Sequence, residues 1–301
     1  MKGHILITGA NGFSGRHACK YFNSQGYKVT GLILGPVEEG LPWFTVTGDL
    51  NHPEQIQSII QRVRPDYVLH LAGKNSVAES WVQPAHYFES NVLGTINLLD
   101  ALRVFPSCRT LIVGSMLRFE VTEDPAPAHP YALSKTLQQF TAKAWRHLFH
   151  QKILLGEPSN LIGPGFSTGI CGLLARAIAK FERGEENKPF RLSSSTEERD
   201  YLDVRDAVSA YAVILEKGKD GETYSIGSGV LRSLGEIVAA FSQMVPRMLP
   251  LEIGDALQAE IPQPVSAQPL KQLGWQPVIS FNQSLKDILD FNRSLNSREG
   301  E

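Results

Sequence analysis

Hydrophobic and polar residues follow two alternating patterns along the first half of this chain. Short apolar runs, such as His4-Ile5-Leu6-Ile7-Thr8, are typical of strands that are buried on both faces of a sheet. Longer stretches with apolar residues at helical spacing separate these runs. The pattern predicts strands at residues 4–8, 28–34, 44–47, 67–71 and 110–114, and helices at 13–25, 53–64 and 84–104.

The repeated order of strand and helix predicts a parallel sheet with right-handed crossovers. We therefore expect an α/β fold with a doubly wound, Rossmann-type sheet and a smaller C-terminal α+β lobe. The lobe is expected after Gly156, where the regularity weakens and Gly163-Pro164-Gly165 interrupts the pattern. A last helix is expected at 280–295. The predicted division is a Rossmann domain at 1–156 with 199–227, a second lobe at 157–198 with 228–295, and a frayed tail at 296–301.

Composition narrows the class of protein. The chain has 301 residues, 42% of them hydrophobic, which is enough for a sizeable core. Its formal net charge of −2, without blocks of like charge, argues against nucleic acid as a partner. No apolar stretch approaches the ~20 residues of a membrane span, so no membrane association is expected. The three widely spaced cysteines predict neither a metal site nor a disulfide framework, and they favour the reducing cytoplasm.

The first strand leads into a glycine-rich turn, Gly9-Ala10-Asn11-Gly12-Phe13-Ser14-Gly15. Such a turn lets the backbone approach a pyrophosphate, and the following helix start directs free amide groups at that anion. Asp49, at the end of the third predicted strand, is placed to reach an adenine amino group, although a turn or capping role is the alternative. These features predict a dinucleotide cofactor.

The choice between NAD(H) and NADP(H) depends on the end of the second predicted strand. An acidic residue there binds the ribose hydroxyls and repels a 2′-phosphate. This chain has Gly31-Leu32-Ile33-Leu34 instead, and Arg16 follows the third glycine of the turn. The sequence therefore favours NADP(H) slightly over NAD(H).

The segment Tyr131-Ala132-Leu133-Ser134-Lys135 carries candidate acid/base chemistry. A spacing of four residues places Tyr131 and Lys135 on one face of a helix. A nearby ammonium lowers the pKa of a phenol from ~10 toward the working pH, which suits proton transfer to a carbonyl oxygen. Ser115 follows the fifth predicted strand, where ligands of such sheets bind.

Several motifs together resemble the extended short-chain dehydrogenase/reductase family, over residues 2 to 290. Within it, the chain is most similar to the nucleotide-sugar 4-ketoreductase branch, the GDP-6-deoxy-4-keto-mannose type. Beside the glycine turn and Tyr131 to Lys135, the motifs are His70-Leu71-Ala72-Gly73, Asn91-Val92-Leu93-Gly94-Thr95, Asn160-Leu161-Ile162-Gly163-Pro164-Gly165 and Arg199-Asp200-Tyr201-Leu202-Asp203.

The resemblance implies roles for individual residues. Tyr131 is the implied acid/base, Lys135 binds the nicotinamide ribose, Ser115 polarises the sugar oxygen and Asn91 completes the catalytic set. The implied cofactor contacts are Gly9, Asn11, Gly12, Phe13, Ser14, Gly15, Arg16, Asp49, Leu50, Leu71, Ala72, Gly73, Tyr131, Lys135 and Pro158. The implied substrate contacts are Ser76, Ser115, Asn160, Arg191 and Arg199, with a structural salt bridge as the alternative for Arg199.

Departures from the family pattern narrow the choice among the reactions of the family. Relatives that dehydrate the sugar carry an acid two positions after the catalytic Ser or Thr, whereas this chain has Leu117, which cannot transfer a proton. Glu157 stands where relatives have an arginine, and Ile261-Pro262 replaces a usual Arg-Pro, so fewer cations remain for a diphosphate.

We therefore expect NAD(P)H-dependent reduction of the 4-keto group of an NDP-4-keto-6-deoxy-hexose. A UDP-hexose 4-epimerase or another sugar-nucleotide reaction is the first alternative, because residues 73–80 resemble the epimerase stretch. A non-catalytic subunit that binds NADP(H) is the second. By resemblance we expect a homodimer that pairs the helices at 84–104 and 131–149.

Overall fold

The computed structural model describes residues 2–119, 121–185, 188–255 and 262–295. The chain divides into two compact units. Unit 1 comprises Met1–Pro158, Val208–Tyr224 and Gln272–Trp275, and unit 2 comprises Ser159–Ala207, Ser225–Lys271 and Gln276–Glu301. The structure thus assigns 199–207 and 225–227 to unit 2, whereas the sequence placed them with the Rossmann domain. It assigns 157–158 and 272–275 to unit 1, whereas the sequence placed them in the second lobe. The expected tail at 296–301 lies outside the described residues.

Unit 1 is built on a seven-stranded sheet in the order β10-β6-β5-β4-β1-β2-β3. The order β3-β2-β1-β4-β5-β6 is that of a dinucleotide-binding sheet, and each of these neighbouring pairs is parallel. This confirms the predicted fold class. The strands are β1 (His4–Thr8), β2 (Lys28–Ile33), β3 (Phe44–Thr47), β4 (Tyr67–His70), β5 (Arg109–Val113), β6 (Lys152–Pro158) and β10 (Thr223–Ile226), and the boundary between the units falls within β10, after Tyr224.

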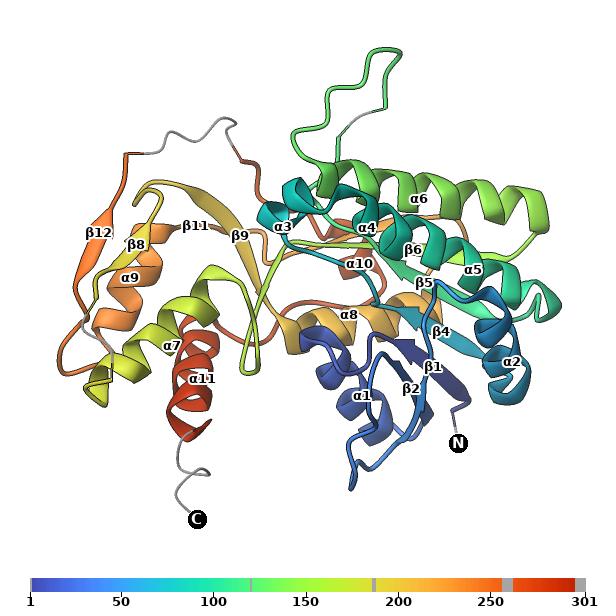
Figure 1. Cartoon of the computed structure of the whole chain (residues 1–301), viewed down its shortest axis with the longest axis horizontal. Coiled ribbons are helices and arrows are strands. Elements are labelled where there is room, and N and C mark those ends of the chain that lie inside the picture. The colour runs from blue at the N-terminus through green and yellow to red at the C-terminus, as the bar shows by residue number, and fades with distance from the viewer. Residues whose placement is uncertain (1, 120, 186–187, 256–261, 296–301) are drawn as a thin grey trace. The chain divides into compact units, whose positions relative to one another are not determined.

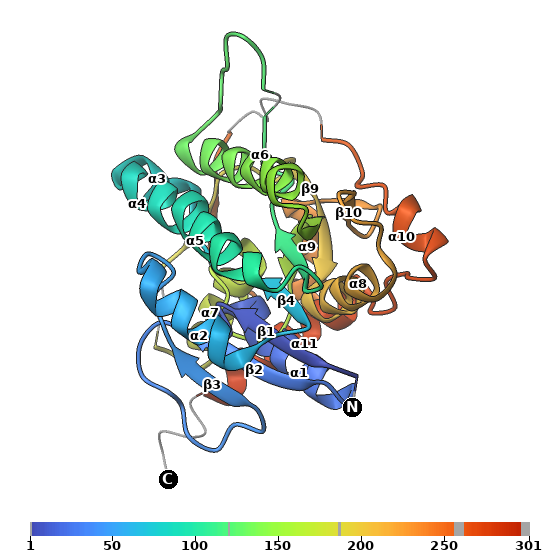
Figure 2. The same ribbon diagram turned by 90° about the vertical axis from the view of Figure 1, so that its right-hand side faces the viewer.

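Helices cover both faces of this sheet. Figures 1 and 2 show α2, α5 and α6 on one face and α1 and α8 on the other. Burial of Ile56, Ile60 and Leu98 against the strands anchors α2 and α5, as their apolar spacing predicts. These helices are α1 (Phe13–Ser24), α2 (Pro53–Val63), α5 (Gly94–Ala101), α6 (Pro130–Phe149) and α8 (Val204–Lys217), and unit 1 also holds α3 (Val77–Val82) and α4 (Pro84–Phe88).

The long helix predicted at 84–104 is interrupted. After α4, residues Glu89–Leu93 form a π-helical turn, α5 follows, and Leu102–Val104 close the segment as a 3₁₀ turn. A π turn adds a residue to the hydrogen-bonded ring and is frequent at functional sites. Hydrophobic periodicity cannot show it, because one extra residue hardly alters the pattern.

Unit 2 holds two small sheets and its own core. One sheet has the order β11-β9-β7 and the other pairs β12 with β8. The core, which includes Leu174, Ile178 and Phe241, joins α7, α9 and α11 to the first sheet. The elements are β7 (Asn160–Ile162), α7 (Ile170–Glu182), β8 (Phe190–Leu192), β9 (Glu198–Asp203), β11 (Leu231–Ser233), α9 (Leu234–Ser242), β12 (Leu251–Ile253), α10 (Gln268–Gln272) and α11 (Phe281–Ser294). Among the described residues, no helix combines the length and apolar character that a membrane span needs.

Candidate active site

The carboxyl ends of β1, β4 and β5 lie side by side in unit 1. The parallel register pairs Thr8 with His70, and His70 with Ile112. The segments that follow these strands therefore meet at one edge of the sheet, where ligands of such folds bind. All predicted catalytic and cofactor residues belong to unit 1.

The glycine turn after β1 is packed too tightly for side chains. Gly9 has a φ of +66°, and a Cβ on Gly15 would lie 2.0 Å from the Gly9 carbonyl oxygen. Helix α1 begins after Gly12 without a side-chain cap and has no acidic residue in its first turn. Its first amide groups thus face no competing carboxylate from that turn, so the turn fits the pyrophosphate of a dinucleotide.

Tyr131 lies in the first turn of α6 and is only 6% exposed. Its ring stacks on His129 at 5.8 Å and meets Tyr87 edge-on at 6.2 Å. Burial raises the pKa of Tyr131, while hydrogen bonding with Ser115 opposes the rise. The sequence predicted that Lys135 lowers this pKa. The structure shows the opposite direction because burial outweighs the favourable contacts.

Ser115 is held beside Tyr131 by the chain that follows β5. Its Oγ accepts a hydrogen bond from the Leu117 amide at 3.0 Å, and the Phe119 amide donates to Thr136 Oγ1 at 3.3 Å. The Ser115 side chain is therefore fixed from its own loop, and its hydroxyl stays available to Tyr131.

Lys135 lies one turn after Tyr131 on α6 and is 6% exposed. Its Nζ donates to the Val113 carbonyl oxygen at 2.9 Å and to Gln138 Oε1 at 2.5 Å. Burial lowers the pKa of Lys135 to about 7. An ammonium has three donors, so these two contacts fix the group and leave one N–H for a further partner.

Asn91 sits in the π turn and is fully buried. Its Nδ2 donates to Ser134 Oγ at 2.9 Å, and its Oδ1 accepts from the Lys74 amide at 2.8 Å. Gly73, with a φ of +151°, makes room for this side chain, since a Cβ there would lie 2.6 Å from Asn91 Oδ1. Asn91 therefore ties α6 to the segment after β4.

A buried hydrogen-bond chain that sequence analysis missed supports Lys135. Gln138 Nε2 donates to Thr95 Oγ1 at 2.9 Å, and Thr95 Oγ1 donates to the Asn91 carbonyl oxygen at 2.7 Å. His70 lies between Thr95 and Thr8, at 2.9 and 2.8 Å.

The donor count fixes the direction of this chain. Thr95 donates its only hydroxyl proton to the Asn91 carbonyl oxygen, so it must accept a hydrogen bond from His70 Nε2–H. His70 Nδ1 then accepts a hydrogen bond from the Thr8 hydroxyl. Burial lowers the pKa of His70 to about 3, which keeps the ring neutral, as this arrangement requires. His70 and Thr95 each lay within a motif in the sequence, but neither was assigned a role there, and nothing marked Gln138.

The remaining predicted cofactor residues lie in the glycine turn or where strands of the sheet end. Asp49 accepts the Asn51 amide at 2.9 Å, so the turn role that the sequence left open for it is present. The Ala72 amide donates to Thr8 Oγ1 at 3.1 Å. Asn11 Nδ2 donates to the Leu34 carbonyl oxygen at 3.3 Å. Leu50 is buried after β3, and Leu71 and Pro158 lie at the ends of β4 and β6.

The predicted substrate residues are divided between the units. In unit 1, Ser76 caps α3, with its Oγ accepting from the Glu79 amide at 3.2 Å. In unit 2, Asn160 Nδ2 donates to the Asp200 carbonyl oxygen at 3.2 Å. Arg191 pairs with Glu252 at 2.6 Å, and Arg199 pairs with Glu197 at 2.7 Å. The salt-bridge alternative for Arg199 is thus present in the structure.

Glu157, which the sequence analysis singled out, is buried in β6 with 2% exposure. Its carboxylate pairs with Arg118 at 2.8 Å, and Arg118 belongs to the loop that carries Ser115. Burial raises the pKa of Glu157, and Arg118 opposes the rise. Glu157 therefore holds the Ser115 loop against the sheet.

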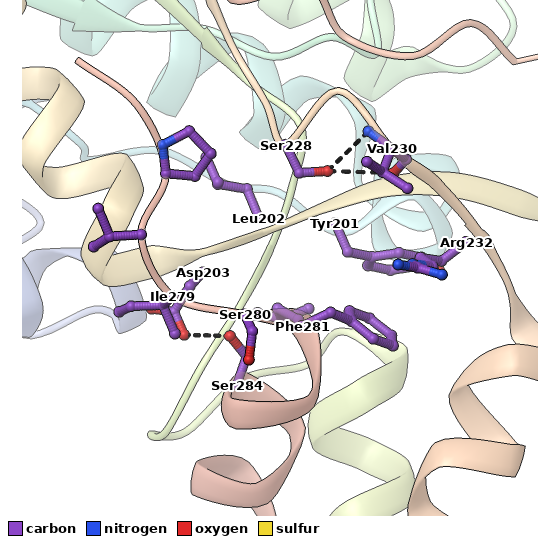
Figure 3. A pocket seen from close by; sticks show the side chains of 13 residues that line it. Tyr201, Leu202, Asp203, Ser228, Val230, Arg232, Ile279, Ser280, Phe281 and Ser284 are labelled. Carbon is purple, nitrogen blue, oxygen red and sulfur yellow. Dashed lines mark hydrogen bonds between the residues drawn. The ribbon is translucent and has the colours of Figure 1, made fainter. Parts of the chain in front are cut away.

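A cavity of about 250 Å³ lies in unit 2, beside the N-terminus of α11. Figure 3 shows Tyr201, Arg232 and Phe281 along one side and the hydrogen bond from Ser284 to Asp203 on the other. It is smaller than typical ligand pockets, and none of the predicted catalytic or substrate residues lines it. The acid/base residues predicted from the sequence lie instead at the strand ends of unit 1. In the part of the chain that the structure describes, no cluster of His, Cys, Asp and Glu suits a metal ion.

Comparison with known proteins gives consistent relatives. The model of the NAD dependent epimerase/dehydratase family matches residues 5–227. The GDP-6-deoxy-D-mannose reductase of Pseudomonas aeruginosa is 30% identical over 96% of this chain and 97% of its own length. The dTDP-glucose 4,6-dehydratase of Xanthomonas campestris is 28% identical over 95% and 92%. The solved structure of RMD from Pseudomonas aeruginosa complexed with NADPH is 29% identical, covers 97% of this chain and 99% of its own, and superposes with a TM-score of 0.81.

Proposed function

The chain belongs to the NAD-dependent epimerase/dehydratase family, and we propose that it reduces the 4-keto group of an NDP-4-keto-6-deoxy-hexose with NAD(P)H. The family match confirms the resemblance to extended short-chain dehydrogenase/reductases and makes NAD(P) the cofactor class. The reductase from Pseudomonas aeruginosa supports a substrate of the GDP-4-keto-6-deoxymannose type, since the two chains match along almost their whole lengths.

One observation carries the proposal: a buried phenol, a serine hydroxyl and a buried ammonium converge where β5 ends. Hydrogen bonding joins Tyr131 to Ser115, and Lys135 is anchored one helical turn away. This is the set of groups that carbonyl reduction needs, because charge develops on the carbonyl oxygen as the carbon is reduced.

The residues of the chain act on that oxygen. When bound, the nicotinamide supplies the hydride. Tyr131 donates its proton to the 4-oxygen, and its raised pKa keeps the phenol protonated until charge develops there. Ser115 donates a hydrogen bond to the same oxygen, and the charged form of Lys135 stabilises the phenolate that remains. Asn91 fixes the position of α6 relative to the segment after β4 through its side-chain hydrogen bonds.

Leu117 favours reduction over dehydration. Its side chain is exposed two positions after Ser115, where dehydration requires a proton-transferring carboxyl. Glu157, an acid on the adjoining strand β6, is engaged by Arg118. We therefore do not assign the dehydratase activity of the Xanthomonas relative to this chain.

We further propose a slight preference for NADP(H), a cytoplasmic location and a homodimer. The cofactor preference is supported by the NADPH that RMD from Pseudomonas aeruginosa binds, and by the lack of an acid in the sequence at the end of β2. Substrate contacts from Ser76, Asn160, Arg191 and Arg199 are part of the same proposal.

The direct test supplies a GDP-4-keto-6-deoxy sugar with NADPH or NADH and follows loss of the reduced cofactor. We expect consumption matched by an equal amount of the 4-hydroxy sugar. No consumption with either cofactor would overturn the reductase proposal.

Two other outcomes identify the alternatives. Redox-neutral interconversion of a UDP-hexose with tightly retained NAD would indicate a 4-epimerase, which the sequence of residues 73–80 favours. Cofactor binding without turnover across a panel of keto sugars would indicate a non-catalytic subunit.

A further inference from the structure

Arg16 and Glu38 form an ion pair at the end of β2. Arg16 Nη2 lies 2.8 Å from Glu38 Oε2, and both side chains are about half exposed, at 49% and 55%. Arg16 Nε also donates to the Asn11 carbonyl oxygen at 3.2 Å. The guanidinium is therefore directed from α1 across the glycine turn to the connection between β2 and β3.

The connection itself is tied to the same edge of the sheet. Asn11 Nδ2 donates to the Leu34 carbonyl oxygen at 3.3 Å, and Thr47 Oγ1 donates to the Gly35 carbonyl oxygen at 3.0 Å. The ion pair thus lies where the adenosine ribose of a dinucleotide binds in this fold.

Arg16 is the cation that the structure brings to this place. The sequence contains no Lys or Arg between residues 29 and 61, while the connection carries two acids, Glu38 and Glu39. Glu38 comes five residues after Ile33, the last residue of β2, too late to stand in the usual position of an acid that binds the ribose hydroxyls. Instead, the Glu38 carboxylate is held at this place by its ion pair with Arg16.

We propose that Glu38 competes with the 2′-phosphate of an NADP-type cofactor for the Arg16 guanidinium, so that this ion pair sets the ratio of the affinities for NADP(H) and NAD(H). The inference rests on the proposed dinucleotide site. A phosphate has more charge and more acceptor oxygens than a carboxylate, and both bind arginine through two parallel hydrogen bonds. A phosphate that binds Arg16 must therefore displace the Glu38 carboxylate from Nη2 or lie beside its negative charge, and either effect weakens the binding that Arg16 provides.

Calorimetric titration with two adenosine fragments tests the ion pair without turnover. Adenosine 2′,5′-bisphosphate carries the 2′-phosphate and AMP lacks it. In Glu38→Gln we expect the affinity for the bisphosphate to rise about 5- to 20-fold at low salt, as expected from removing one charge at contact distance in water, while AMP changes less than about twofold. The matched control is Glu39→Gln, the exposed neighbour, which should leave both affinities unchanged.

A double-mutant cycle shows whether the effect acts through Arg16. Arg16→Met should weaken the bisphosphate more than AMP, and in that background Glu38→Gln should gain no more than about threefold. An unchanged ratio in Glu38→Gln, or an equal gain with and without Arg16, would overturn the competition. If wild-type protein binds neither fragment, the dinucleotide site itself is wrong, which separates the two failures.

Discussion

At the scale of single residues, burial decides the electrostatics of the candidate site. It raises the pKa of Tyr131 and lowers that of Lys135 to about 7, so both groups are driven toward their neutral forms. A neutral phenol is the form that donates a proton. The charged form of Lys135 is stabilised by the two carbonyl oxygens to which its Nζ donates, those of Val113 and of the Gln138 side chain.

Replacing Tyr131 by Phe removes the proton donor and preserves the ring that stacks on His129. We expect turnover to fall ~10²-fold or more, with little change in cofactor affinity. Steady-state kinetics and calorimetry of NADP⁺ binding measure the two quantities. Near-normal turnover would show that another group donates the proton.

Lys135→Met gives a stability change that depends on pH. The pKa of Lys135 is about 7 in the folded protein, against an ordinary value of 10.5 for a lysine in the unfolded chain. Below pH 7 both states hold the proton, and the folded state bears the full cost of burying it. As pH rises from 7 to 10.5, the unfolded state binds more protons, so the wild type gains stability.

The substitution removes this cost. Between about pH 6 and about pH 9, the free energy of unfolding of the variant relative to wild type should therefore decrease by about 2–3 kcal/mol. Urea unfolding at both pH values measures it, with Lys152→Met, an exposed lysine on β6, as control. An equal difference at both pH values would contradict the assignment.

At the scale of elements, two helices show how close packing overrides local preference. Gly15 lies in the first turn of α1, and on helix propensity alone its replacement by alanine would stabilise the helix by up to ~1 kcal/mol. The Gly9 carbonyl oxygen occupies that space. In the segment from α4 to α5, the π turn interrupts regular α-helix and carries Asn91. Both departures lie beside the strand ends, where the candidate site is built.

Gly15→Ala should therefore destabilise the protein, against its helix propensity. A Cβ would lie 2.0 Å from the Gly9 oxygen and 2.8 Å from Ala10 Cα, so the turn or the helix must shift. We expect a loss of about 2 kcal/mol or more, seen as a lower Tm in calorimetry. Gly169→Ala, at the N-cap of α7, is the steric control, because its Cβ meets nothing closer than 3.4 Å, and only the smaller loss of about 1 kcal/mol or less that alanine causes at an N-cap is expected there. A Tm at or above that of the wild type would refute the steric argument.

The sequence predicted the first five strands and the first two long helices of unit 1 because their apolar patterns are unambiguous, but it did not predict β6, β10 or α8. Strands β1 to β5 match the predicted runs to within a residue or two. Sequence reasoning missed the short helix α3, whose start depends on the Ser76 cap. It also missed Gln138, because a buried amide at helical spacing looks like an ordinary polar position, and it assigned no role to Thr95, although Thr95 ends the Asn91 motif. Long-range contacts such as Arg118 with Glu157 have no local signal at all.

At the scale of the whole molecule, the exposed apolar side chains of unit 1 indicate where a second copy of the chain could bind. Exposed apolar residues occur along the segment from α4 to α6 of unit 1: Leu93 is 50% exposed, Val104 61%, Phe140 60% and Leu148 66%. Such exposure on adjoining helices suits contact with a second copy. The homodimer stays a prediction.

Phe140→Asp tests the predicted dimer. A charge on this face should prevent pairing, so sedimentation velocity should show twice 33.2 kDa for wild type and the single mass for the variant. Phe44→Asp, at a 68% exposed phenylalanine on β3, is the control and should remain dimeric. A monomeric wild type, or a dimeric Phe140→Asp, would contradict the prediction.

The path of the chain between the units also limits how this protein can be altered by recombination. Unit 2 is assembled from three separated segments, 159–207, 225–271 and 276–301, and unit 1 supplies the pieces between them. Transplanting specificity from a homologue by a single crossover would thus leave a chimaera with mismatched halves of one core. A workable graft must exchange all three segments together, with every junction placed where the chain changes unit.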